Sequence, residues 1–220
     1  GASARAGLAD FAGGTVAKTG NEETVAREYL TQHQAAFGAL GASNEFETAK
    51  VKSQGNRAYV RINQHYNGIP VFGAQILVQV NSGTGVTSVL SDILSDTQPF
   101  DDGTIPLSPS VTSTEAESAA IAFMAEYAAV NEAFLYSAKP TRVIFDPEVL
   151  GVPGTQCVAW GTVVESNAGA LMKEVVFVNA QTGAIVFHYS VIEESIEREI
   201  YDANEAYDVL GELVRAEGDP

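Results

Sequence analysis

The sequence of 220 residues has few of the residue types from which most catalytic and metal sites are built. Its single cysteine, Cys157, excludes an intrachain disulfide, and its apolar neighbours predict a buried, unreactive thiol. Its three histidines, His33, His65 and His188, form neither a His-Glu-x-x-His pair nor a triplet at ligand spacing. No Gly-x-Ser-x-Gly sequence is present to position a nucleophilic serine. We therefore expect a chain that is not an enzyme and holds no metal or other cofactor.

Basic residues and long apolar runs are also scarce. The 12 Lys and Arg residues face 28 Asp and Glu residues, which gives a net charge of -16. Such a charge repels phosphate backbones and anionic lipids, so we expect no nucleic-acid partner and no membrane partner. No run approaches the roughly 18 apolar residues that a membrane helix needs. Half of the net charge lies in residues 193–220, which we predict to be a distinct acidic, extended segment.

The first part of the chain predicts a helix followed by strands. Residues 1–20 are rich in Gly and Ala without a lasting period, and predict a flexible lead-in. After Asn21, two acidic residues and apolar residues at helical spacing predict an amphipathic helix over 22–36. From Arg57 the period changes to two, and one face then carries Val60, Ile62, Gln64 and Tyr66.

Two turns organise the strands that follow. Asn67-Gly68 accepts the positive φ angles of a tight hairpin, and a returning strand runs to Val80. A second turn over 81–85 leads into a strand over 86–94. The first unit is therefore predicted to be one helix packed on an antiparallel meander.

A second unit follows a stretch rich in Pro, Gly and Asp between Ser95 and Val111, which marks a linker. Thr114 and Glu117 have the spacing of a capping box, and an apolar stripe follows at Ala116, Ala120, Phe123, Tyr127 and Val130. Strands are predicted over 141–145, 157–165, 171–178 and 184–189. The turn over 178–183 repeats the pattern of the turn over 80–85, which suggests two units of similar architecture.

These patterns predict an α+β fold of two small domains, each a helix packed on an antiparallel β-sheet, with a C-terminal acidic extended segment. The predicted boundaries are 1–20 for the lead-in, 21–97 for the first domain, 98–112 for the linker, 113–194 for the second domain and 195–220 for the C-terminal region.

Three segments carry a resemblance to a known family. Residues 63–76, Asn-Gln-His-Tyr-Asn-Gly-Ile-Pro-Val-Phe-Gly-Ala-Gln-Ile, closely resemble the signature of the fungalysin and thermolysin propeptide (FTP) domain. Residues 114–194 resemble the PepSY domain that follows it in those zymogens, above all at 171–183. Segments 198–204 and 213–218 look like the opening strands of the mature peptidase. The order of the three resemblances matches the order in the zymogen.

The resemblance implies a secreted or extracytoplasmic pro-region that is an intramolecular chaperone and active-site inhibitor of a thermolysin-like zinc metallopeptidase. Its partner would be the catalytic domain of that peptidase, which would hold the zinc and whose zinc motif would lie beyond Pro220. Cleavage would fall near residues 193–197. Three alternatives stay open: a free-standing secreted PepSY-type binding or regulatory module, a protease inhibitor acting in trans, and an enzyme of unknown type.

Two sets of residues are candidate sites. The end of the last predicted strand and the turn-free segment after it are assigned to occupying the peptidase cleft by strand addition, with a carboxylate reaching zinc. They are His188, Tyr189, Ser190, Val191, Ile192, Glu193, Glu194 and Ser195. The second set lies around the signature turn and either docks the peptidase or shapes its own domain: Gln64, Tyr66, Gly68, Pro70, Phe72 and Gly73. We favour the structural role, because Gly, Pro and Asn at turns serve backbone geometry, whereas exposed aromatics would favour docking.

Overall fold

The computed structural model describes residues 21–37, 43–167, 172–192, 199–201 and 213–216. It confirms the α+β class: within these residues one nine-stranded mixed sheet is accompanied by three α-helices. The helices are α1 (Glu22–Gln32), α2 (Gln98–Asp101) and α3 (Ser113–Ala128). The strands of the sheet are β1 (Asn44–Gln54), β2 (Arg57–Tyr66), β3 (Ile69–Asn81), β4 (Gly85–Asp92), β5 (Leu135–Ser137), β6 (Thr141–Phe145), β7 (Cys157–Ser166), β8 (Lys173–Asn179) and β9 (Ile185–Ser190). Three 3-10 helices, η1 (Gln34–Phe37), η2 (Glu132–Phe134) and η3 (Pro147–Leu150), complete this part, and β10 (Glu199–Tyr201) pairs with β11 (Leu213–Ala216) apart from it.

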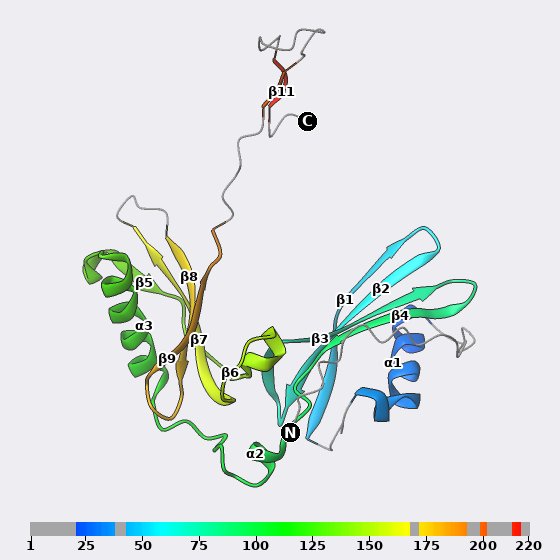
Figure 1. Cartoon of the computed structure of the whole chain (residues 1–220), viewed down its shortest axis with the longest axis horizontal. Helices are drawn as coiled ribbons and strands as arrows, with labels where there is room; N and C mark the ends of the chain where they lie inside the picture. The colour runs from blue at the N-terminus through cyan, green and yellow to red at the C-terminus, as the bar shows by residue number, and fades with distance from the viewer. Residues whose placement is uncertain (1–20, 38–42, 168–171, 193–198, 202–212, 217–220) are drawn as a thin grey trace.

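The sheet consists of two antiparallel meanders, β1–β4 and β6–β9, joined through β3 in the order β1-β2-β3-β6-β7-β8-β9. The C-terminal part of β3 pairs with β4, whereas its N-terminal part pairs in parallel with β6 at Val71 and Ile144. The expected antiparallel meanders are therefore present, but the sheet that contains them is continuous and mixed. It is bent into an arch, with α1 and α3 on its outer flanks and α2 below (Figure 1). The boundary between two domains stays a prediction.

Helix α1 buries one face against the first meander. The Asn21 side chain caps it by accepting a hydrogen bond from the Thr24 amide, which satisfies a backbone donor at the helix start. Its buried residues Val25, Ala26, Tyr29 and Leu30 pack on the inward-facing residues of β2 and β3. The helix ends at Gln32 and not at residue 36 as predicted, because the chain tightens into η1 after His33.

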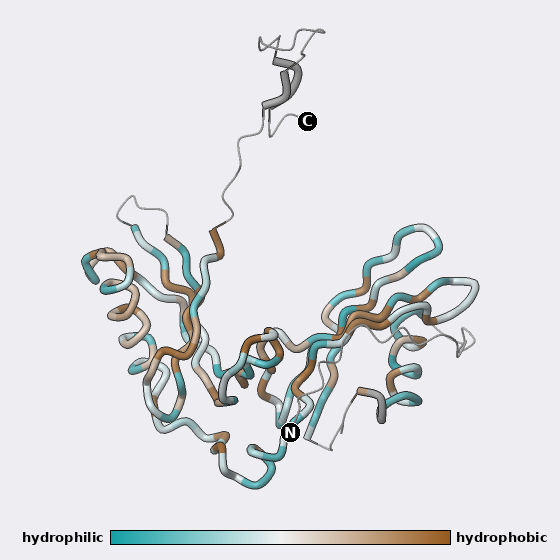
Figure 2. Tube along the Cα trace, in the orientation of Figure 1, coloured by the Kyte–Doolittle hydropathy of each residue, from teal (hydrophilic) through white to brown (hydrophobic). Residues whose placement is uncertain are grey.

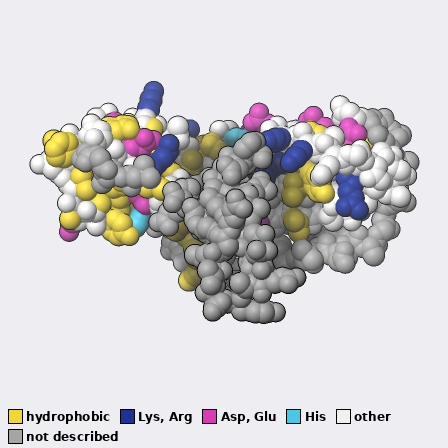
Figure 3. Space-filling model, turned by 90° about the horizontal axis from the view of Figure 1, so that it is seen from above, with side chains coloured by type: hydrophobic (Ala, Val, Ile, Leu, Met, Phe, Trp, Pro, Cys, Tyr) yellow, Lys and Arg dark blue, Asp and Glu magenta, His cyan; other side chains and the backbone are white. Residues whose placement is uncertain are grey.

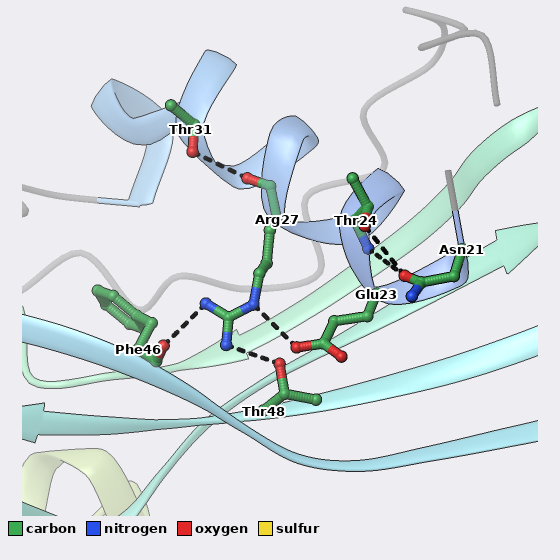
Figure 4. A network of polar contacts seen from close by, with 7 residues as sticks. All are labelled: Asn21, Glu23, Thr24, Arg27, Thr31, Phe46 and Thr48. Atoms are coloured by element: carbon green, nitrogen blue, oxygen red, sulfur yellow. Dashed lines mark hydrogen bonds and ion pairs between the residues drawn. The ribbon is translucent and has the colours of Figure 1, made fainter. Parts of the chain in front are cut away.

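Arg27 ties α1 to β1, a strand that the sequence did not predict (Figure 4). Its guanidinium donates to the Glu23 carboxylate at 3.1 Å, the Phe46 carbonyl at 3.0 Å and the Thr48 hydroxyl at 2.8 Å. Most side chains of β1 are exposed and several are charged, so its sequence lacks the apolar alternation by which strands are recognised. The polar tips of the hairpins and the apolar central strands are visible in Figure 2.

Helix α3 begins two residues earlier than predicted. Thr112 and Glu115 form the capping box, and the Trp160 indole N–H donates to the Val111 carbonyl at 2.8 Å just before it. The buried face is Ala116, Ala120 and Met124, whereas Tyr127, predicted to be in the apolar stripe, is 63% exposed. The four strands predicted for this half are present with ends shifted by two residues or fewer, and β5 is an additional short strand.

The repeated turn of the sequence is also repeated in the structure. Asn81 accepts a hydrogen bond from the Gly83 amide, and Asn179 accepts one from the Gln181 amide. Each turn ends in a glycine with positive φ and joins the third strand of a meander to the fourth. Apart from β5, which occurs only in the second half, the two halves therefore share one order of elements, a helix followed by a four-strand meander.

Candidate functional site

The residues with the strongest family resemblance lie where the two meanders meet. The β2–β3 turn has φ angles of 48° at Asn67 and 70° at Gly68, as the sequence predicted. Directly after it, Val71 pairs with Ile144 of β6. The hairpin that carries the resemblance is thus the connection between the halves, which we call the joint.

Gln64 is fully buried at the joint, with an exposed fraction of 0%. Its amide nitrogen donates to the Asn44 side-chain oxygen at 2.7 Å and to the Leu94 carbonyl at 3.0 Å. Its amide oxygen accepts from the Leu94 amide at 2.8 Å. Because buried polar groups must find partners, this side chain fixes the path of the chain as it leaves β4 for the linker.

Tyr66 fastens the linker to the same hairpin. Its ring is buried, and its hydroxyl donates to the Asp101 carboxylate of α2 at 2.6 Å. Burial, followed by this hydrogen bond, raises the pKa of Tyr66. The hydrogen bond from Tyr66, followed by one from Thr97, lowers the pKa of Asp101, because both stabilise the carboxylate.

Phe72 crosses from the first half into an aromatic cluster on the sheet face opposite α3. Its ring centroid lies 4.4 Å from that of Phe177, and the cluster contains Phe72, Phe145, Phe177, Phe187 and Tyr189. Next to it, Gly73 has φ 75°, and a Cβ there would lie 2.9 Å from the Leu150 Cδ2 atom. Glycine at this position thus serves both its backbone conformation and the close approach of η3.

The other candidates of the signature turn, Gly68 and Pro70, are exposed. The burial of Gln64 and Tyr66 and the packing of Phe72 fit a structural role for these residues. The docking role stays a prediction for the exposed positions.

A shared core and a clamped linker complete the joint. One buried cluster combines Tyr66, Ile69, Val71, Ala74, Leu94 and Phe100 with Ile144, Val158 and Ala180 of the second half. The Ala180 carbonyl accepts from the amides of Ser110 and Val111, and the Gln181 side chain donates to the Ser108 carbonyl at 2.7 Å. Sequence reasoning missed Gln181, which gave no signal beyond its place in a turn. It also missed the aromatic cluster, for which the alternate positions of Phe187 and Tyr189 were a usable signal.

The candidate inhibitory segment begins inside the sheet. His188, Tyr189 and Ser190 belong to β9, and the Val191 amide extends the pairing by donating to the Lys173 carbonyl at 2.9 Å. The His188 ring packs edge-on against Phe123 and Tyr127 of α3, with Nδ1 3.3 Å from the Glu174 carboxylate. Tyr189 joins the aromatic cluster. Ile192 is the last described residue of the segment, and Glu193, Glu194 and Ser195 lie outside the described residues.

The described part of the chain contains no group of three His, Cys, Asp or Glu side chains able to hold a metal ion. Cys157 is buried, and burial, with a smaller contribution from Asp146, raises its pKa to about 11. The predicted burial of this thiol is therefore confirmed, and the raised pKa disfavours the reactive thiolate. None of the described helices is both long and apolar enough to span a bilayer.

Comparison with known proteins supports the first of the three resemblances. The family model described as the Fungalysin/Thermolysin Propeptide Motif matches residues 47–93, which run from within β1 to just after β4. No curated protein matches the chain. Among solved structures, the chain is similar to the Bacillus megaterium YpeB C-terminal domain, with 11% identity and a TM-score of 0.37 over 78% of this chain and 64% of that one. A likeness this weak supports no functional argument, so the PepSY resemblance stays a prediction.

The matched motif belongs, by its description, to the propeptides of fungalysins and thermolysins. The match confirms the FTP resemblance over residues 47–93.

Proposed function

We propose that this chain is the pro-region of a secreted thermolysin-like zinc metallopeptidase, which assists the folding of that peptidase and then inhibits it by occupying its cleft. The observation that carries the proposal is the propeptide motif over residues 47–93. Residues 195–220 would be the start of the mature peptidase, and the zinc would belong to the partner's catalytic domain.

The chaperone role needs a surface that keeps its shape. A partner that binds the native peptidase stabilises it by mass action, and one that also binds the folding transition state lowers the barrier. A surface ordered beforehand loses less entropy when it binds. The buried Gln64 contacts, the Tyr66–Asp101 hydrogen bond and the Phe72 ring contacts order the joint in this way.

The inhibitory role needs a segment that enters a substrate cleft. Strand β9 is last in the sheet order, so among the described residues one of its edges is unpaired. The chain leaves the sheet here, and residues 191–195 contain no Gly or Pro. Such a segment is suited to lie extended as an added strand in a cleft. The Glu193 or Glu194 carboxylate would then reach the partner's zinc.

Shortened chains test the cleft assignment. A chain ending at Ile192 keeps β9 and the Val191 hydrogen bond but loses the predicted zinc-reaching residues. We expect it to inhibit a thermolysin-like zinc peptidase orders of magnitude less than the full chain, with an unchanged unfolding temperature. A chain ending at Glu197 is the matched control and should inhibit like the full chain. A chain ending at Phe187 should also lose inhibition, but it additionally removes His188 and Tyr189 from their ring contacts.

Undiminished inhibition by the chain ending at Ile192 would show that another surface blocks the peptidase. If the full chain inhibits no such peptidase, the pro-region proposal fails. The hypothesis of a free-standing regulatory module is then better supported. Sequencing the gene beyond Pro220 for a His-Glu-x-x-His motif separates the pro-region from this module and from an inhibitor acting in trans.

A further inference from the structure

The face of the first meander that is turned away from α1 carries an unusual set of cations. Along β2, Val60 and Ile62 are buried in the core under α1. Because side chains alternate along a strand, Arg57, Tyr59 and Arg61 lie on the opposite face.

Strand β1 adds two more cations to this face. The register pairs Lys50 with Arg61 and Lys52 with Tyr59, and residues paired across antiparallel strands share a face. All four cationic residues, Lys50, Lys52, Arg57 and Arg61, are exposed. They therefore form one surface at the outer half of the β1–β2 hairpin.

These four side chains make no ion pair with any residue of the described part of the chain. Of the four other Lys and Arg side chains that the structure describes, three are engaged: Arg27 with Glu23, Lys173 with Glu165, and Arg142 with a backbone carbonyl. The net charge of the chain is -16, so a group of four neighbouring cations that make no ion pair within the described residues stands out from the rest of the surface.

Apolar side chains lie beside the cations on the same face. Leu77 pairs with Arg61 on one side and with Leu90 on the other, and Leu90 is 44% exposed. Figure 3 shows Lys and Arg side chains beside apolar ones on the half that carries β1–β4. The cations on β1 and β2 therefore border an apolar pair on β3 and β4, and apolar side chains next to charged ones are common where a surface binds another protein. We call these residues the open cationic face: Lys50, Lys52, Arg57, Tyr59, Arg61, Leu77 and Leu90.

We propose that the open cationic face binds an acidic surface of the peptidase catalytic domain. The inference rests on the proposed function, under which residues 195–220 begin the peptidase. This beginning contains eight acidic and two basic residues, so the only part of the partner present in the sequence is acidic. Two acidic proteins repel each other at long range, and a local cationic face selects the one approach in which they attract. The face therefore orients the peptidase and speeds its association.

The test compares the full chain with the double variant Lys50→Glu/Arg61→Glu, using as probe a thermolysin-like zinc peptidase of acidic pI. At about 10 mM ionic strength, where screening extends to about 30 Å, we expect inhibition to set in about tenfold more slowly for the variant. At about 1 M salt the two rates should converge. Lys139→Glu/Arg142→Glu is the matched control, because it changes the net charge by the same amount and both residues are exposed and lie outside the face. Unfolding temperatures of all three proteins verify that they are folded.

Equal onset rates for the full chain and the double variant at low salt would overturn the inference and leave the proposed function standing. Absence of inhibition by the full chain would overturn both. A second probe, a peptidase of the same class with basic pI, should reverse the order, with the double variant now faster. The same order with both probes would overturn the inference. Salt-dependent binding of duplex DNA that the double variant abolishes would also overturn it, by giving the face a nucleic-acid partner.

Discussion

The two halves of the sheet share their order of elements but differ in the face that no α-helix covers. In the first half this face presents exposed cations beside Leu90. In the second half it presents the aromatic cluster, into which Phe72 of the first half packs. The difference shows that one topology can carry different side chains at the alternate strand positions: aromatic rings that join the two halves in one case and exposed cations in the other.

The outer edges of the sheet differ in the same way. Strand β1 carries charges at Glu45, Glu47, Lys50 and Lys52 and a register shift between Thr48 and Lys50, which are devices that discourage pairing with another strand. Strand β9, Ile185–Ser190, contains no Asp, Glu, Lys or Arg. Its edge therefore lacks charge protection, and this fits the proposal that the chain leaves the sheet at β9 to add as a strand elsewhere.

The largest loss of stability is expected when a ring is removed from the aromatic cluster. Phe177 is buried, and its ring covers Gly161, where a Cβ would lie only 2.9 Å away. Phe177→Ala should lower the free energy of unfolding by about 3–5 kcal/mol, because it removes ring contacts and leaves a cavity. Tyr59→Ala on the open cationic face is the matched control and should cost under about 1 kcal/mol. Denaturant unfolding measures both, and similar losses would mean that the two faces do not differ as described.

An intermediate effect is expected at the joint. Gly73 and Gly55 both have positive φ, but only a Cβ at Gly73 would press on Leu150. Each Gly→Ala change should cost about 1–2 kcal/mol for the left-handed backbone. Gly73→Ala should cost more, because η3 must also move. Urea midpoints compare the two variants, and equal losses would show that the Leu150 side chain gives way freely.

The smallest effect is a difference in pH dependence between two carboxyl groups. Burial first, with repulsion from Glu148 as a lesser cause, raises the pKa of Asp146 above its unfolded value. The folded state then binds the proton of Asp146 more tightly than the unfolded state does. The contribution of Asp146 to the free energy of unfolding therefore increases as the pH falls through the folded-state pKa. Asp146→Asn keeps an acceptor for the Glu148 amide and should raise the unfolding temperature slightly at neutral pH. This increase in unfolding temperature should disappear in acid, where the Asp146 carboxyl is protonated.

Asp101 is expected to have the opposite pH dependence of stability. Its pKa is lowered by the Tyr66 hydrogen bond, so its contribution is present above the unfolded pKa and is lost as pH falls through the folded pKa. Tyr66→Phe should therefore lower the unfolding temperature at neutral pH and have little effect in acid. Thermal scans across pH test both variants, and parallel pH profiles for the two would contradict these assignments.

Local chemistry made much of the fold predictable. The Asn67-Gly68 turn, the buried face of β2 and the strand over 141–145 were all read from spacing and turn residues. The start of α3 was misplaced because Thr112 with Glu115 and Thr114 with Glu117 have the same spacing. Strand β1 was missed because its pairing partner, and not an apolar pattern, makes it a strand.

The features of the candidate site were likewise predictable only in part. By itself, the sequence determined the turns, the alternation along the strands and the propeptide motif, because these depend on neighbours within a few residues. Only the tertiary structure decided that Gln64 bonds Leu94, that Phe72 enters the aromatic cluster and that Lys50 lies beside Arg61. Such contacts join segments far apart in the chain, and they follow from strand order and register, which no local pattern encodes.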